Sequence, residues 1–320
     1  LTNIFNEIFQ HGNVLQNEGI VILIPKKGRT NRIDNLRPIT LLNTDIKLLA
    51  KIYKARISTF LHKIIGDNQA AVGKVKNIYY ALHSIRDIVA YFRLQDTPAC
   101  VTSFDFRNAF DRIEHSYLYA VLQAYNFHHT FIDKVKALYT NATSQLQING
   151  YLSPSFRLNR GVRQGCSLSM LLFCLAVEPF LQSMKQVHCS DLHIFKSIGV
   201  FAFADDVTVT WSQPAQLQHI TVALRNYCHG SGAKINVQKS KHMVFNDRSI
   251  LNVPSDVVQY DVVTQLKILG VTFTQRERDQ DDIIWSPIVN QVRHLCSTHK
   301  HRNLNLLQRL CGFLTPSFVP

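Results

Sequence analysis

The stretch FAFADDVTVTW at residues 201–211 decides the fold, because it puts two adjacent carboxylates inside a sequence typical of a buried sheet. Apolar and small residues lead up to Asp205 and Asp206, and β-branched residues follow them. Such residues favour strands, so we expect two strands joined by a turn at the acidic pair. The two acids belong either to an ordinary polar hairpin turn or to a functional site that requires negative charge.

Composition limits the classes of partner. The chain has 320 residues, of which 46% are hydrophobic and 18% charged, as is usual for a globular protein of one large domain or two to three subdomains. Lys and Arg together number 35 against 22 Asp and Glu, so the formal net charge is +13. This excess favours a polyanionic partner, nucleic acid before a membrane.

The cysteines and the apolar segments exclude several other classes. The seven cysteines form no CxxC pair, which disfavours zinc ribbons and a disulfide framework and favours a reducing compartment. The longest apolar stretch, residues 168–181, is too short to span a bilayer and contains Glu178. We therefore expect an intracellular protein without membrane contact. Because the chain starts at Leu1, we also expect a fragment or an excised domain.

Periodicity predicts a mixture of helices and strands without regular alternation. Expected strands lie at 19–28, 99–104, 241–245 and 266–273, and an expected hairpin lies at 144–159. Expected helices lie at 41–61, 77–94, 116–125, 130–142, 170–186 and 215–229 and over the last 35 residues. This order indicates an α+β fold, with a sheet covered by helices on one face.

A third acid, Asp105, closes the expected strand VTSFD. If this strand lies beside those that flank Asp205 and Asp206, the three carboxylates converge at one end of an antiparallel sheet. Converging carboxylates repel, and their desolvation raises their pKa, so they attract a divalent cation. Two such ions about 3.5–4 Å apart can hold the attacking and leaving oxygens of a phosphoryl transfer.

Several segments between residues 20 and 275 resemble the motifs of a known family and follow one another in the same order as in that family. They are ILIPKKG (22–28), NLRPITLLNTDIKLLAKIYKARI (35–57), FDFRNAFDRIEH (104–115), GVRQGCSLSMLLF (161–173), FAFADD (201–206), SGAKINVQKSK (231–241) and LKILGVTF (266–273). The two acidic segments resemble the catalytic motifs of reverse transcriptases, and the whole set is similar to the non-LTR (LINE-type) retrotransposon enzymes of animals. One such motif is weak, whereas the ordered set is highly specific.

The resemblance implies a right-hand polymerase. Residues 1–100 would form the fingers with an N-terminal extension, 101–274 a palm with an antiparallel sheet and an interleaved part of the fingers, and 275–320 the start of a helical thumb. The implied activity is RNA-directed DNA synthesis on an RNA template, with a DNA primer or target DNA, dNTPs and two Mg²⁺ ions, for which Mn²⁺ can substitute. The implied location is the nucleus or a cytoplasmic ribonucleoprotein, and the oligomeric state stays open.

The resemblance also assigns the metal ligands. Asp105 and Asp205 match the two main ligands, Asp206 a weaker ligand or a source of negative field, and Phe106 a residue whose carbonyl completes one metal shell. Lys239 matches a lysine that protonates the leaving pyrophosphate; an ordinary surface lysine is the competing interpretation.

The expected substrate contacts come from three further segments. Phe110 matches an aromatic that lies under the sugar and excludes a 2′-hydroxyl, with simple core packing as the alternative. Arg37 fits a guanidinium that binds the triphosphate. Arg163, Gln164 and Gly165 match the loop that contacts the incoming nucleotide or the template base. The usual prolines of this loop are replaced by Ser167 and Met170, which puts its rigidity in question.

Three alternatives remain open from the sequence. A group II intron-type or telomerase-like polymerase is the nearest, although the motif text favours the retrotransposon class. A catalytically decayed or domesticated nucleic-acid-binding relative is the second, and the retained acids oppose it. An unrelated α+β hydrolase with an Asp-Asp metal site is the third, and it would not need a primer.

Overall fold

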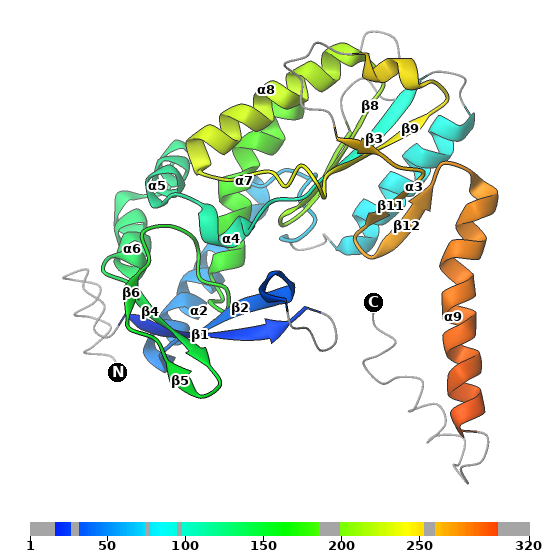
Figure 1. Cartoon of the computed structure of the whole chain (residues 1–320). Helices are drawn as coiled ribbons and strands as arrows, with labels where there is room; N and C mark the ends of the chain where they lie inside the picture. The colour runs from blue at the N-terminus through cyan, green and yellow to red at the C-terminus, as the bar shows by residue number, and fades with distance from the viewer. Residues whose placement is uncertain are drawn as a thin grey trace.

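The computed structural model describes residues 17–26, 32–73, 77–94, 98–185, 199–252 and 260–299. Two five-stranded sheets organise these residues, and a separate two-stranded hairpin lies close to one of them (Figure 1). The mixture of helices with antiparallel-rich sheets confirms the expected α+β class.

The first sheet carries the acidic residues, and we call it the palm sheet. Its strands are β3 (Ala99–Phe104), β7 (Gly199–Phe203), β8 (Asp206–Trp211), β9 (Lys241–Phe245) and β10 (Asp261–Val262), in the spatial order β10-β9-β3-β8-β7. Strand β3 pairs antiparallel with both β8 and β9, and β7 pairs antiparallel with β8. Only the short β10 is parallel to its neighbour, β9.

Both faces of the palm sheet are covered, so the expectation of helices on one face is wrong. Cys100 and Phe104 of β3 point into a large core with α5 (His115–Ala124), α7 (Ser169–Lys185) and α8 (Pro214–Ser231). Val101, which alternates with them, points into a second core with α3 (Ile78–Leu94) and the hairpin of β11 (Gln265–Ile268) and β12 (Val271–Thr274). The period of two along a strand sends neighbouring residues to opposite faces.

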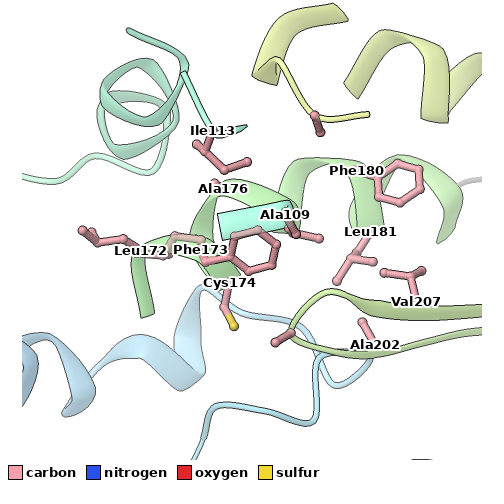
Figure 2. Packing of buried hydrophobic residues seen from close by; sticks show 14 of the residues in the cluster. Ala109, Ile113, Leu172, Phe173, Cys174, Ala176, Phe180, Leu181, Ala202 and Val207 are labelled. Carbon is pink, nitrogen blue, oxygen red and sulfur yellow. The ribbon is translucent and has the colours of Figure 1, made fainter. Parts of the chain in front are cut away.

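Helix α7 is the central helix of the larger core. Its residues from Leu171 to Glu178 are all buried, as expected of a helix that is apolar on every side. Figure 2 shows Phe173 and Cys174 of α7 between Ala109 of α4 (Ala109–Arg112) and the β7–β8 hairpin. This helix therefore links the segment after Asp105 to the segment around Asp205.

The second sheet contains β1 (Glu18–Pro25), β2 (Leu36–Leu41), β4 (Thr143–Ile148), β5 (Tyr151–Leu152) and β6 (Phe156–Arg157). The expected hairpin is confirmed: Asn149 and Gly150, at φ 50° and 86°, join β4 to β5 in the left-handed conformations typical of a two-residue turn. Strand β2 and the parallel pairing of β1 with β4 were not expected.

The remaining elements complete the chain. They are η1 (Ile33–Asn35), α2 (Thr44–Ser58), η2 (Leu61–Lys63), α6 (His129–Tyr139), η3 (Arg248–Leu251) and α9 (Glu277–His299). The expected C-terminal helix is thus present up to His299, and residues 300–320 lie outside the described part. No helix in the described ranges is both long and apolar enough to cross a membrane.

Candidate active site

Three carboxylates lie at one edge of the palm sheet. Phe104 pairs with Val207 across β3 and β8, and Phe203 pairs with Asp206 across β7 and β8. The end of β3, the end of β7 and the start of β8 are therefore level. Asp105 directly follows Phe104, so it lies beside the turn that holds Asp205 and Asp206, as the sequence predicted.

The carboxylates perturb one another. Desolvation, together with the neighbouring charges of Asp205 and Asp105, raises the pKa of Asp206 to about 6. Desolvation also raises the pKa of Asp205, as does the charge of Asp105. Like charges held together in a partly desolvated place disfavour ionisation unless a cation compensates them.

One cationic side chain of the protein acts on these carboxylates. The guanidinium of Arg37, on β2 of the second sheet, acts in the opposite direction on the pKa of Asp205 and lowers it. Arg37 has an exposed side chain. The structure thus places Arg37, the expected triphosphate-binding arginine, near enough to Asp205 to act on the pKa of its carboxylate.

The backbone of Asp105 is held by the segment just before β9. The Asp105 N–H donates to Ser240 Oγ at 3.0 Å, and the Asp105 carbonyl accepts from the Asn236 N–H at 2.7 Å. Lys239 lies in the same turn, where its N–H donates to the Asn236 carbonyl at 3.1 Å. Lys239, the expected proton donor to pyrophosphate, therefore belongs to the turn that holds the Asp105 backbone, and its side chain is exposed.

Phe106 extends the backbone pairing between Asp105 and the segment before β9, but its own carbonyl is not used in that pairing. The residue forms an antiparallel bridge with Ile235, flanked by the hydrogen bond from Asn236 to Asp105 and by that from the Arg107 N–H to the Lys234 carbonyl. The Phe106 carbonyl takes part in neither bond. Its ring is 8% exposed and packs edge-on against Tyr227 with centroids 5.9 Å apart.

Phe110 lies on α4 and keeps part of its ring exposed. The ring stacks on Phe173 of α7, with centroids 4.4 Å and planes 21° apart. Packing against the core and a role under the sugar are compatible, because one face of the ring is held while the rest remains accessible. The sugar role stays a prediction.

The loop before α7 hydrogen-bonds to the second sheet. The Thr40 N–H donates to the Gln164 carbonyl at 2.7 Å, which joins the loop to β2 a few residues from Arg37. Gly165 has φ 107°, and a Cβ there would lie 2.5 Å from the Thr40 carbonyl oxygen. Only glycine fits this close approach without a shift of the backbone.

The side chain of Gln164 reaches a fourth acid. Its Nε2 donates to Asp111 Oδ2 at 3.4 Å, and the pKa of Asp111 is raised by desolvation, against which this hydrogen bond acts. Gly161 and Val162 also donate to the carbonyls of Ile113 and Phe110 at 2.7 Å. The loop is therefore joined to the segment after Asp105 as well as to β2.

The Arg163 side chain of this loop points into the interior. Its side chain is 5% exposed, and Nη2 donates inward to the Leu138 carbonyl at 2.8 Å. Its Nε and Nη1 have no hydrogen-bond partner among the described residues. In this structure the guanidinium ties the loop to the end of α6, and the substrate contact of Arg163 stays a prediction.

The loop keeps its turns without the usual prolines. The Cys166 N–H donates to the Arg163 carbonyl at 3.1 Å, and the Ser169 N–H donates to the Cys166 carbonyl at 3.2 Å. These turns lead directly into α7 at Ser169. Ser167 and Met170 are thus accommodated by backbone hydrogen bonds.

A bound metal would have to draw the acids closer together. Within the described ranges, no three His, Cys, Asp or Glu side chains form a ready-made metal site. The donor chemistry nevertheless fits Mg²⁺, since Asp105, Asp205, Asp206 and the Phe106 carbonyl offer only hard oxygen ligands. Desolvation first, and the neighbouring negative charges second, raise the pKa values of Asp205 and Asp206, as is expected of carboxylates that no cation compensates.

Sequence reasoning missed the residues that support the site. Asn236 and Ser240 lie in a matched segment but carried no signal of their own, since Asn and Ser in a turn are common. Asp111 ends the repeated F-D pattern of FDFRNAFD, and that repetition was a usable signal.

Comparisons with known proteins identify the class of this site. The family described as reverse transcriptase (RNA-dependent DNA polymerase) matches residues 24–273. The chain therefore belongs to the reverse transcriptase family, and the expected domain of an RNA-directed DNA polymerase is confirmed.

The relatives narrow the class further. The chain is 32% identical over 249 residues to the transposon TX1 uncharacterized 149 kDa protein of Xenopus laevis, a match that covers 75% of this chain and 19% of the relative. It is 25% identical over 275 residues to the Pol polyprotein of the type-2 retrotransposable element R2DM of Drosophila melanogaster, covering 80% and 25%. The chain thus carries a non-LTR reverse transcriptase domain that spans a quarter or less of the length of these relatives.

Solved structures support the fold. Telomerase from Candida tropicalis in complex with a TWJ fragment of telomeric RNA superposes with a TM-score of 0.56 at 12% identity, covering 92% of this chain and 52% of that one. A C-terminally truncated apo form from the same organism gives a TM-score of 0.53 at 14% identity, covering 84% and 57%. The expected right-hand polymerase fold is confirmed.

Proposed function

We propose that this chain adds deoxynucleotides to a primer 3′-hydroxyl, copies an RNA template and releases pyrophosphate. The observation that carries this proposal is the placement of Asp105, Asp205 and Asp206 at one edge of the palm sheet, with Arg37 facing them from the second sheet. This arrangement suits in-line transfer of a phosphoryl group, in which positioning and charge stabilisation supply most of the catalysis.

Each residue then has a separate task. Asp105 and Asp205 would hold two Mg²⁺ or Mn²⁺ ions, and Asp206 and the Phe106 carbonyl would complete the donor set. When bound, the ions would supply Lewis-acid stabilisation of the attacking and leaving oxygens. Arg37 binds the triphosphate, and Lys239 donates a proton to the departing pyrophosphate.

Two further residues select the substrate. Phe110 lies under the sugar and excludes a 2′-hydroxyl. Gln164, fixed through its backbone to β2 and through its side chain to Asp111, contacts the incoming nucleotide or its template base.

The net charge of +13 supports a polyanionic substrate. An RNA template paired with a DNA primer would be held mainly through its phosphates, so affinity should fall steeply as salt rises. A nuclear or ribonucleoprotein location follows from such partners.

Primer extension by the Asp205→Asn variant tests the proposal. The assay uses an RNA template, a DNA primer, dNTPs and Mg²⁺, and hybrid affinity is measured in parallel. Asp205→Asn should reduce extension by more than the ~10–100-fold that is typical for loss of an outer metal-site partner, while hybrid affinity stays unchanged. Asp133→Asn is the matched control, since Asp133 is exposed on α6 and pairs only locally with Lys136.

Two results would contradict the assignment. Equal extension by wild type and Asp205→Asn would remove Asp205 from the mechanism. No extension by the wild type, with the hybrid still bound, would favour the alternative of a nucleic-acid-binding relative without catalysis.

A further inference from the structure

The turn that carries Asp205 contains an unusual backbone conformation. Ala204, directly before Asp205, has φ 55°. The left-handed region is uncommon for a residue with a Cβ and costs free energy, so it persists only where the surroundings impose it. Ala204 is 3% exposed, so contacts within the protein must impose this conformation.

Gln69 provides these contacts through its side-chain amide. Gln69 Oε1 accepts from the Ala204 N–H at 2.8 Å, and Gln69 Nε2 donates to the Ala204 carbonyl at 3.4 Å. The same Oε1 also accepts from the Ala71 N–H at 3.2 Å. One amide therefore holds both backbone groups of the residue before the catalytic acid.

The segment around Gln69 is itself fixed to the palm sheet. The Ala202 N–H donates to the Asn68 carbonyl at 2.8 Å, and the Ala70 N–H donates to the Ala202 carbonyl at 2.7 Å. Gln69 and Ala202 thereby form a parallel bridge on β7, which is the edge strand of the sheet. Residues 68–70 act as a short additional strand that covers this edge.

Burial makes the contact specific. Gln69 is 0% exposed, although glutamine is usually a surface residue. A buried amide is tolerated only where its donors and acceptors are satisfied. Here they are satisfied by the backbone of the turn and by Ala71, which leaves the side chain little freedom to move.

We propose that Gln69 is a positioning residue for catalysis, which sets the direction of Asp205 by fixing the left-handed conformation of Ala204. Gln69 touches no reacting group; it acts through the Ala204–Asp205 peptide. Loss of the amide would free Ala204 to leave the left-handed region and would turn the Asp205 carboxylate away from Asp105. This inference rests on the proposed polymerase function.

Gln69→Met tests the proposal, because methionine keeps the length of the side chain and lacks the amide. Gln216→Met is the matched control. Gln216 is 3% exposed, and its Oε1 likewise accepts from two backbone N–H groups, those of Ser212 and Gln213, at 2.8 and 3.0 Å. Each variant loses a buried amide whose oxygen accepts two backbone hydrogen bonds. Only the amide of Gln69 contacts the turn that carries Asp205.

The first measurement is steady-state primer extension with varied dNTP and Mg²⁺. Gln69→Met should lower kcat ~10–100-fold, as loss of an outer metal-site partner does, and should raise the Mg²⁺ concentration for half-maximal extension, with a smaller change in the KM for dNTP. Gln216→Met should change none of these. Equal effects of the two variants would overturn the proposal, since they would reflect a general loss of stability.

The second measurement is independent of activity. Hydrogen exchange at the Ala204 amide in the metal-free chain should accelerate in Gln69→Met and stay slow in wild type and Gln216→Met. An Ala204 amide that remains protected in Gln69→Met would overturn the inference. If the wild type fails to extend any primer, the proposed function fails, and the exchange result still decides whether Gln69 fixes the turn.

Discussion

The two principal carboxylates are held in different ways. Asp105 is positioned by main-chain pairing with residues 234–240, reinforced by the hydroxyl of Ser240. Asp205 lies on a turn whose preceding residue, Ala204, is held by the side-chain amide of Gln69. The first support comes from 135 residues later in the chain, and the second from 135 residues before Ala204.

The difference shows which support is more sensitive to substitution. A main-chain pairing survives most side-chain changes, because its donors and acceptors belong to the backbone. A turn that depends on one buried amide has no such reserve. We therefore expect Gln69 substitutions to affect extension at least as strongly as single substitutions at the supporting residues Asn236 and Ser240.

Ser240→Ala sharpens this comparison and should have the largest effect of the three changes below. The Asp105 N–H would lose its acceptor, and a buried unpaired donor costs about 1–3 kcal/mol. Because main-chain pairing at Asn236 remains, extension should fall by about 10-fold, near the lower limit for an outer metal-site partner. Primer extension and hybrid affinity are measured together.

Ser231→Ala is the matched control for Ser240→Ala. Both serines are 0% exposed, and Ser231 Oγ bonds to the Tyr227 carbonyl and the Ala233 N–H rather than to Asp105. If the two alanine variants lose extension equally, Ser240 has no special relation to Asp105.

Phe110→Ala tests a residue that belongs to neither support. The ring is held by stacking on Phe173, so its removal opens space without releasing either carboxylate. The ratio of dNTP to rNTP incorporation should fall by roughly 5-fold, the lower end of what one contact contributes, while Mg²⁺ dependence stays unchanged. One contact of this size is worth on the order of 1–3 kcal/mol in discrimination. Unchanged sugar discrimination would assign Phe110 to core packing.

Asp206 gives the smallest expected effect, which concerns stability and pH. The folded-state pKa of about 6 lies above the ordinary value of 3.8, so the folded chain binds this proton more tightly than the unfolded chain does. Its contribution to the free energy of unfolding therefore falls as pH rises from about 4 to about 6. Asp206→Asn has no carboxyl to titrate at this position, so its free energy of unfolding does not fall for this reason.

Melting temperatures in EDTA measure the effect. The variant should gain stability over wild type as pH rises from 4.5 to 7.5, and Mg²⁺ at pH 7.5 should raise the melting temperature of the wild type more than that of Asp206→Asn. A pH-independent difference between the two proteins would contradict the raised pKa.

Sequence patterns were sufficient to predict most helices and strands and to single out the acidic residues. Runs of apolar and β-branched residues located β3, β7 and β8, and the Asn149-Gly150 pair located a hairpin, because these signals depend on neighbouring residues alone. The acids could be recognised because the segments around them belong to an ordered set of motifs that resembles one family, whereas the Asp205-Asp206 pair alone could have been an ordinary turn. Arg37 was chosen for its chemistry, and its position across from Asp205 agrees with that choice.

Only the tertiary structure decided how these parts support one another. The covering of the palm sheet on both faces, the inward turn of Arg163 and the contacts of Ser240 and Gln69 all join residues that are far apart in the chain. A buried serine or glutamine looks like any turn residue until its partner is known, because the hydrogen bond that explains it is made by a distant backbone group. The sequence by itself therefore determined the family, the acids and most of the elements, whereas the three-dimensional packing decided which polar residues hold those acids in place.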